Sequence, residues 1–136
     1  MRRADEFVLY CDGAARGNPG PAAIGAVLYD PIDREPIAEV SARIGVATNN
    51  VAEYRALEAG LEKARELGVR RLSVRLDSQL LVRQLKGEYR VKNAGLKPLF
   101  ASVRLLIDGF DSVEVAHVRR ESNTVADALA NAALDR

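Results

Sequence analysis

One amphipathic helix pattern near the middle of the chain most constrains its fold. Three good N-cap residues at 48–50 open it, helical spacing continues to about Leu67, and Gly68 is a typical stop signal. Its apolar stripe consists of Ala56, Leu57, Gly60, Leu61 and Ala64. Such a helix can serve as a crossover, so a strand after it can pair in parallel with a strand before it.

The segment before this helix has the pattern of an antiparallel meander. Residues 5–12, 22–30 and 36–44 are rich in strand-forming residues. A dense turn signal at 16–21 and the pair Asp30-Pro31 separate these segments. The connections are too short for crossovers, so we expect three antiparallel strands.

After the central helix, strand and helix patterns alternate. Strand patterns occupy 72–77 and 113–118, and helix patterns occupy 78–85, 95–107 and a last segment that extends to Leu134. Asn123 is expected to cap this last helix. The predicted order is βββαβααβα. We therefore expect an α/β fold, one domain over residues 1–136, with a five-stranded mixed sheet and helices on both faces.

Composition limits the possible chemistry. The formal charge is only +1, so net charge gives no sign of a nucleic-acid partner. Cys11 is the only cysteine and His117 the only histidine, which excludes an internal disulfide and a two-histidine metal site. The early apolar run at 7–11 is far too short for a membrane span or a signal-peptide core, so we expect a cytoplasmic protein without membrane contact.

Four acidic residues occupy positions that favour a chemical role. Asp12 and Asp77 are expected at the carboxyl ends of the first and fourth strands, where α/β sheets bind ligands. Glu53 is expected in the first turn of the central helix, along its buried stripe, where an unpaired charge is rare. Asp127 is expected in the first turn of the last helix. Each aspartate could alternatively be a turn or cap residue.

Carboxylates packed together repel one another and need a compensating cation. Ligand sets made only of oxygen select hard ions such as Mg²⁺ or Mn²⁺. Two such ions can clamp an in-line displacement at phosphorus. The arrangement of the four acids therefore favours a two-metal phosphoryl-transfer site over four unrelated caps.

At this point the sequence resembles the ribonuclease HI family, the type 1 ribonucleases H. The matching pieces are Asp12-Gly13, the segment 17–21, the segment 48–50 with Glu53, the segments 77–79 and 91–93, and Asn123 with Asp127. They follow the family's order and spacing over about residues 7–134. No single piece is specific to the family, but the ordered set, with an acid at each of the four matching positions, is specific.

The resemblance implies an endonuclease that hydrolyses the RNA strand of RNA/DNA hybrids and leaves 5′-phosphate and 3′-hydroxyl ends. It also implies two Mg²⁺ or Mn²⁺ ions held by Asp12, Glu53, Asp77 and Asp127. Asp12 is expected to bridge both ions, Asp77 and Asp127 to lie near the ion that activates water, and Glu53 to lie near the other. We expect the hybrid as partner and a monomeric protein.

The resemblance further assigns substrate contacts. Asn18, Asn49, Asn50 and Gln79 match the family's minor-groove residues, and amides can both donate to and accept from a ribose 2′-hydroxyl. Thr48 and Asn93 match a pocket for a DNA phosphate. Without the family, a turn is the simpler reading for Asn18, an N-cap for Thr48 and a loop for Asn93.

The chain also departs from many bacterial members, which carry a histidine in a long loop before the last helix. Here residues 119–122 form the whole connection, and His117 falls on the fifth strand pattern, as a structural or rim residue. Arg119 or Arg120 could assist release of the leaving group or product phosphate. Another nuclease of this fold and a non-catalytic hybrid-binding module remain as alternatives; the amide set argues against the first and the four acids against the second.

Overall fold

The computed structural model describes residues 5–136 and contains one sheet of five strands. The strands are β1 (Glu6–Ala15), β2 (Gly20–Tyr29), β3 (Pro36–Ala47), β4 (Arg71–Leu76) and β5 (Ser112–His117). The helices are α1 (Asn49–Glu66), α2 (Gln79–Leu85), α3 (Lys97–Asp108) and α4 (Thr124–Asp135), with a short 3₁₀ turn, η1 (Arg120–Ser122), before α4. The predicted element order is confirmed.

The sheet has the order β3-β2-β1-β4-β5. The first three strands pair antiparallel, whereas β4 pairs in parallel with both β1 and β5. The mixed ribonuclease H-like sheet predicted from the sequence is therefore confirmed. The parallel register ends with Cys11 opposite Leu76, so the next residue on each segment is an aspartate.

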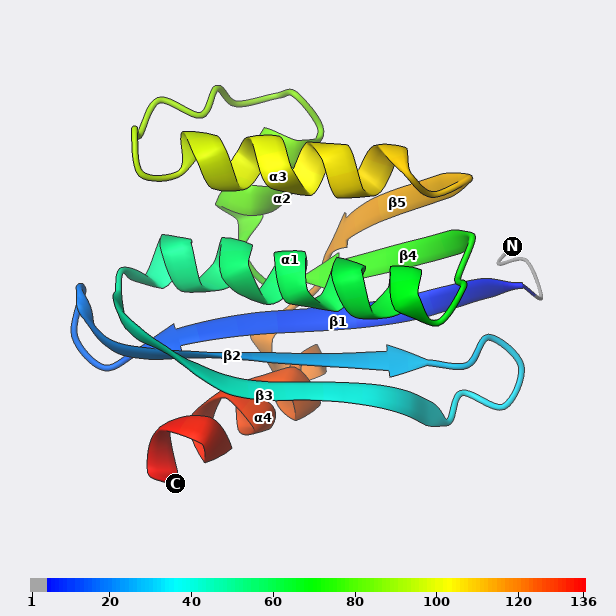
Figure 1. Ribbon diagram of the computed structural model, residues 1–136, viewed down its shortest axis with the longest axis horizontal. Coiled ribbons are helices and arrows are strands. Elements are labelled where there is room, and N and C mark those ends of the chain that lie inside the picture. Colours follow the sequence, from blue (N-terminus) through cyan, green and yellow to red (C-terminus); the bar gives the residue numbers. More distant parts are fainter. Residues whose placement is uncertain (1–4) are drawn as a thin grey trace.

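Helices lie on both faces of the sheet (Figure 1). The apolar stripe of α1 packs on β1, where Gly60 lies against Leu9 and Cys11, and α3 packs on α1. On the opposite face, α4 packs mainly on β1, β2 and β3, with the backbone of Ala126 close to Gly25. None of the helices within residues 5–136 is both long and apolar enough to cross a membrane.

The strands of the antiparallel meander extend further than predicted, whereas β4 and β5 each lie one residue earlier. β1 continues from residue 12 to Ala15, because Asp12 and Gly13 pair with Gly25 and Ile24 in the hairpin. β2 correspondingly begins at Gly20. β3 continues past residue 44 to Ala47, since a bulge opposite 22–23 and a positive φ of 84° at Gly45 let the strand bend without ending. The sequence predicted Asp12 at the end of the first strand, but the residue lies within β1.

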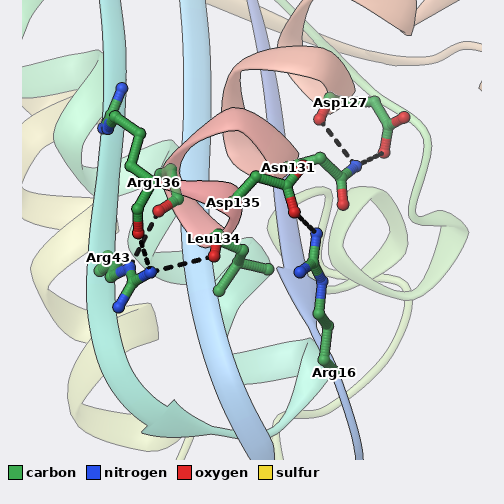
Figure 2. A network of polar contacts seen from close by, with 8 residues as sticks. Arg16, Arg43, Asp127, Asn131, Leu134, Asp135 and Arg136 are labelled. Atoms are coloured by element: carbon green, nitrogen blue, oxygen red, sulfur yellow. Dashed lines mark hydrogen bonds and ion pairs between the residues drawn. The ribbon is translucent and has the colours of Figure 1, made fainter.

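Arginine side chains fasten the C-terminal end of α4 to the sheet (Figure 2). Arg43 on β3 donates to the carbonyls of Ala133 and Leu134, at 2.9 and 3.0 Å, and also to that of Arg136. These carbonyls have no partner within the helix, because the last turn of any helix leaves its acceptors free. Arg16 forms an ion pair of 2.7 Å with Asp135.

Candidate active site

The fold brings together the side chains of Asp12, Glu53 and Asp77. One carboxylate oxygen from each lies within 4.8 Å of the others. Asp12 comes from β1, Asp77 directly follows β4, and Glu53 comes from α1. Glu53 lies just beyond the first turn of α1 and not within it as predicted, because the helix begins at Asn49. Asp12 is only 6% exposed, and the other two are half-buried.

Asp127 completes the acidic group from the first turn of α4. Its side chain shares a hydrogen bond with that of Asp12. Asn131, one turn further along α4, donates from Nδ2 to Oδ1 of Asp127 at 3.2 Å and to its carbonyl at 3.0 Å (Figure 2). The four acids expected from the sequence are therefore neighbours, contributed by four different parts of the chain.

Without a cation the group keeps protons that isolated carboxyls would lose. Burial, followed by the charge of Glu53 and the hydrogen bond that protonated Asp12 donates to Asp127, raises the pKa of Asp12 to about 9. Burial and the charge of Asp77 raise the pKa of Glu53 to about 7. Hydrogen bonds from Asp12 and from the backbone of Gly13 oppose this rise. The acidic group therefore holds protons at a pH at which isolated carboxyls would be ionised.

Gly13 is required for the close approach of β1 and α1. A side-chain carbon at this position would come within 2.2 Å of the backbone of Ala52. The missing side chain lets the Gly13 amide donate to the Glu53 carboxylate. Gly13 thus connects two of the acids, because it follows Asp12 in the chain and its amide donates to Glu53.

Asn123 holds Asp77 in place, a role that the sequence did not suggest. Its Nδ2 donates to Oδ2 of Asp77 at 3.0 Å and to the carbonyl of Cys11 at 2.9 Å. The residue is 1% exposed, and its Oδ1 has no hydrogen-bond partner among residues 5–136. The expectation that its side chain caps the last helix is wrong, because the amide is directed to β1 and Asp77 instead.

Three of the predicted substrate residues gather where the β1–β2 loop meets the start of α1. The side-chain oxygen of Asn18 accepts from the amide of Asn49 at 3.0 Å, and that of Asn49 accepts from the amide of Ala15 at 3.2 Å. Asn50 follows on the same turn, and all three are exposed. Thr48 caps α1 by accepting from Val51 at 3.2 Å, the simpler of its two readings.

The other predicted contacts lie on separate segments. Gln79 is exposed on the first turn of α2, directly after the Asp77-Ser78 pair. Asn93 is exposed in the loop between α2 and α3, where its Oδ1 accepts from the amide of Gly95 at 2.7 Å. Asn93 therefore has the local turn role expected of a loop residue.

The two arginines after β5 differ in their relation to the acids. Both are exposed, but the charge of Arg120 lowers the pKa of Glu53. His117 is the last residue of β5, opposite Leu76, and its side chain is exposed. It is thus a rim residue, as expected.

Comparison with known proteins identifies close relatives. A family model described as "Reverse transcriptase-like" matches residues 10–133. A ribonuclease HI from Halobacterium salinarum is 48% identical over 98% of this chain and 66% of its own length. A bifunctional protein from Mycobacterium tuberculosis is 44% identical over 96% of this chain, which spans only 36% of that relative.

Solved structures agree with these matches. The crystal structure of the RNase H1 from Halobacterium salinarum has a TM-score of 0.93 at 47% identity, covering 96% of this chain and 98% of the other. LC11-RNase H1, solved in complex with an RNA/DNA hybrid, has a TM-score of 0.89 at 42% identity, covering 95% of this chain and 96% of the other.

Proposed function

Because the chain belongs to the ribonuclease HI family, we propose that it hydrolyses the RNA strand of RNA/DNA hybrids, leaving 5′-phosphate and 3′-hydroxyl ends. The observation that carries this proposal is the meeting of Asp12, Glu53 and Asp77 within 4.8 Å, with Asp127 beside Asp12. Carboxylates this close together are unsuited to binding a nucleic acid by themselves, because they repel its phosphates. With a bound cation they are suited to hydrolysing it.

The donor set fits two divalent cations, Mg²⁺ or Mn²⁺. Every donor is a carboxylate oxygen, the ligand type that such hard ions prefer. The raised pKa values of Asp12 and Glu53 also indicate that the group needs compensating positive charge, because the carboxyls retain protons where a bound cation would balance the charge. When bound, the ions would supply an activated water and stabilise the charge of the leaving oxygen. Asp12 interacts with each of the other three acids and would be suited to contact both ions.

The remaining residues would position the hybrid. Asn18, Asn49 and Asn50 offer amide groups on one exposed edge, and Gln79 offers another beside Asp77. Amides suit a ribose 2′-hydroxyl, which distinguishes RNA from DNA. Thr48 and Asn93 are proposed to contact a phosphate of the DNA strand.

A cleavage assay with a labelled hybrid tests this function. We expect Mg²⁺-dependent cleavage of the RNA strand of the hybrid, and none of a DNA duplex or of single-stranded RNA. Asp12→Asn, purified in parallel, should be inactive, which excludes a contaminating nuclease. Hybrid binding without cleavage would instead support a non-catalytic module, and cleavage of the DNA duplex would favour another nuclease of this fold.

A further inference from the structure

A second hollow lies outside the acidic group. A cavity of about 330 Å³ is formed on the sheet face that carries α4, at the first turn of that helix. Side chains of β1, β2 and β4 form its floor, and none of the four acids lines it. Its volume is at the lower end of the range for small-molecule sites.

The cavity wall carries two arginines and no carboxylate. Arg75 projects from β4, and Arg34 lies in the turn between β2 and β3. Arg75 donates from Nε to Oγ of Ser73 at 3.0 Å, which leaves its other donors free, and neither guanidinium forms an ion pair within residues 5–136. On the face of the sheet that carries Arg75, Asp77 lies two residues further along and the exposed Glu114 lies opposite Ser73, and Arg75 forms an ion pair with neither among the described residues. Two guanidinium groups facing one cavity favour an anionic ligand, and phosphate suits their fork of donors.

Two tyrosine rings form the apolar part of the wall. Tyr10 and Tyr29 meet edge to face, with ring centroids 5.8 Å apart and an interplanar angle of 89°. Both rings are half-buried, so part of each remains open to a ligand. Such a pair offers one ring face on which a flat group can stack.

The first turn of α4 supplies unused donors beside these residues. The backbone amides of Thr124, Val125 and Ala126 have no acceptor within the described part of the chain. All three residues line the cavity, and the positive end of the helix dipole points toward it. Asn123 also lines the cavity, and its buried Oδ1 has no hydrogen-bond partner within residues 5–136.

We propose that this cavity binds a small phosphate monoester with a planar base, the chemistry of a nucleoside monophosphate. The phosphate is held by Arg34, Arg75 and the amides of the first turn of α4. The base stacks on Tyr10 or Tyr29. The proposal does not depend on hybrid cleavage, because no proposed metal ligand takes part.

Titration followed by backbone amide NMR tests the site. The probes are adenosine monophosphate, adenosine and inorganic phosphate, each added with EDTA so that no metal bridges a phosphate to the acids. We expect saturable shifts of the Thr124 and Val125 amides with the monophosphate, and weaker binding of either half alone. Arg75→Gln and Arg34→Gln should each weaken binding about tenfold. Arg65→Gln, on an exposed position of α1, is the matched control.

Three results would overturn the site. One is the absence of saturable shifts at α4, and another is a set of shifts centred on Glu53 and Asp77. The third is equal binding by Arg34→Gln and Arg65→Gln. Arg34 is exposed in a turn, so its variant tests the site even if Arg75→Gln disturbs the sheet.

Discussion

At the scale of single residues, the four acids could be predicted from the sequence, but the residues that hold them in place could not. Charged residues are rarely buried, so a glutamate on an apolar stripe and aspartates near strand ends are unusual. This made the four acids recognisable as candidates for a chemical role. Asn123 is not unusual in this way, because an asparagine before a helix is typical of an N-cap. Its contact with Asp77 joins residues 46 positions apart, which only the folded chain brings together. Gly13 is similar, since its closeness to Ala52 depends on helix packing.

Asn123 provides the first prediction. Asn123→Ala should remove the hydrogen bonds to Asp77 and to the Cys11 carbonyl. We expect hybrid cleavage to fall about 10–100-fold, with a higher metal concentration needed for half-maximal rate, because an outer contact that orients a ligand is lost. The free energy of unfolding should fall by about 1–3 kcal/mol, since the buried carbonyl loses its donor. Cleavage rates across a Mg²⁺ titration and urea unfolding measure the two effects.

Ser102→Ala is the control for this variant. Ser102 also donates to a carboxylate, that of Glu58 at 2.6 Å, but at the contact between α1 and α3. It should leave the metal dependence of cleavage unchanged. An unchanged metal dependence in Asn123→Ala as well would reduce Asn123 to a structural residue.

The arginines after β5 carry the second prediction. Arg120→Ala should slow single-turnover cleavage, because the charge of Arg120 acts on Glu53, whereas Arg119→Ala and His117→Ala should stay close to wild type. The loss should be equal from pH 6 to 9, since a guanidinium stays charged over the whole window in which a histidine titrates. A large loss in His117→Ala, with Arg120→Ala unaffected, would assign the role to the histidine.

At the scale of elements, type and order followed from the sequence and several ends did not. The turn signal at 16–21 correctly separates two strands, but the hairpin continues to its last pair, Ala15 opposite Ala22. Asp12 and Gly13 are poor strand formers by propensity, yet pairing with β2 and contact with α1 hold them extended. Gly45 likewise looks like a strand end and proves to be a bend within β3.

The attachment of α4 provides the third prediction. Arg43→Met should lower the free energy of unfolding by about 1–3 kcal/mol, because the carbonyls of the last turn of α4 lose a charged donor (Figure 2). Arg16→Met removes only the exposed ion pair with Asp135 and should cost less than about 1 kcal/mol. Urea unfolding of both variants provides the comparison. Equal costs would mean that the carbonyl contacts add nothing beyond surface charge.

At the scale of the whole molecule, the fold concentrates negative charge that the composition conceals. The chain as a whole has a formal charge of +1, yet four acids from β1, α1, α4 and the end of β4 meet where the parallel pairing of β1 and β4 ends. The stability of the metal-free protein should therefore depend on pH through this site.

The last prediction gives the sign of that dependence. Asp12 and Glu53 have ordinary pKa values of 3.8 and 4.5, and in the folded protein their pKa values are raised to about 9 and about 7. Between these limits the folded protein holds more protons than the unfolded chain, so the free energy of unfolding should fall as pH rises from about 4 to about 9. Urea midpoints in EDTA at pH 5, 7 and 9 measure this fall. Glu53→Gln should flatten it and gain more than about 1.4 kcal/mol at pH 9, the equivalent of one pKa unit. Glu62→Gln, exposed on the same helix, should keep the wild-type slope. Added Mg²⁺ should restore stability at high pH in the wild type and in Glu62→Gln but not in Glu53→Gln. A midpoint that stays level or rises with pH in the wild type would mean that another group compensates the buried acids.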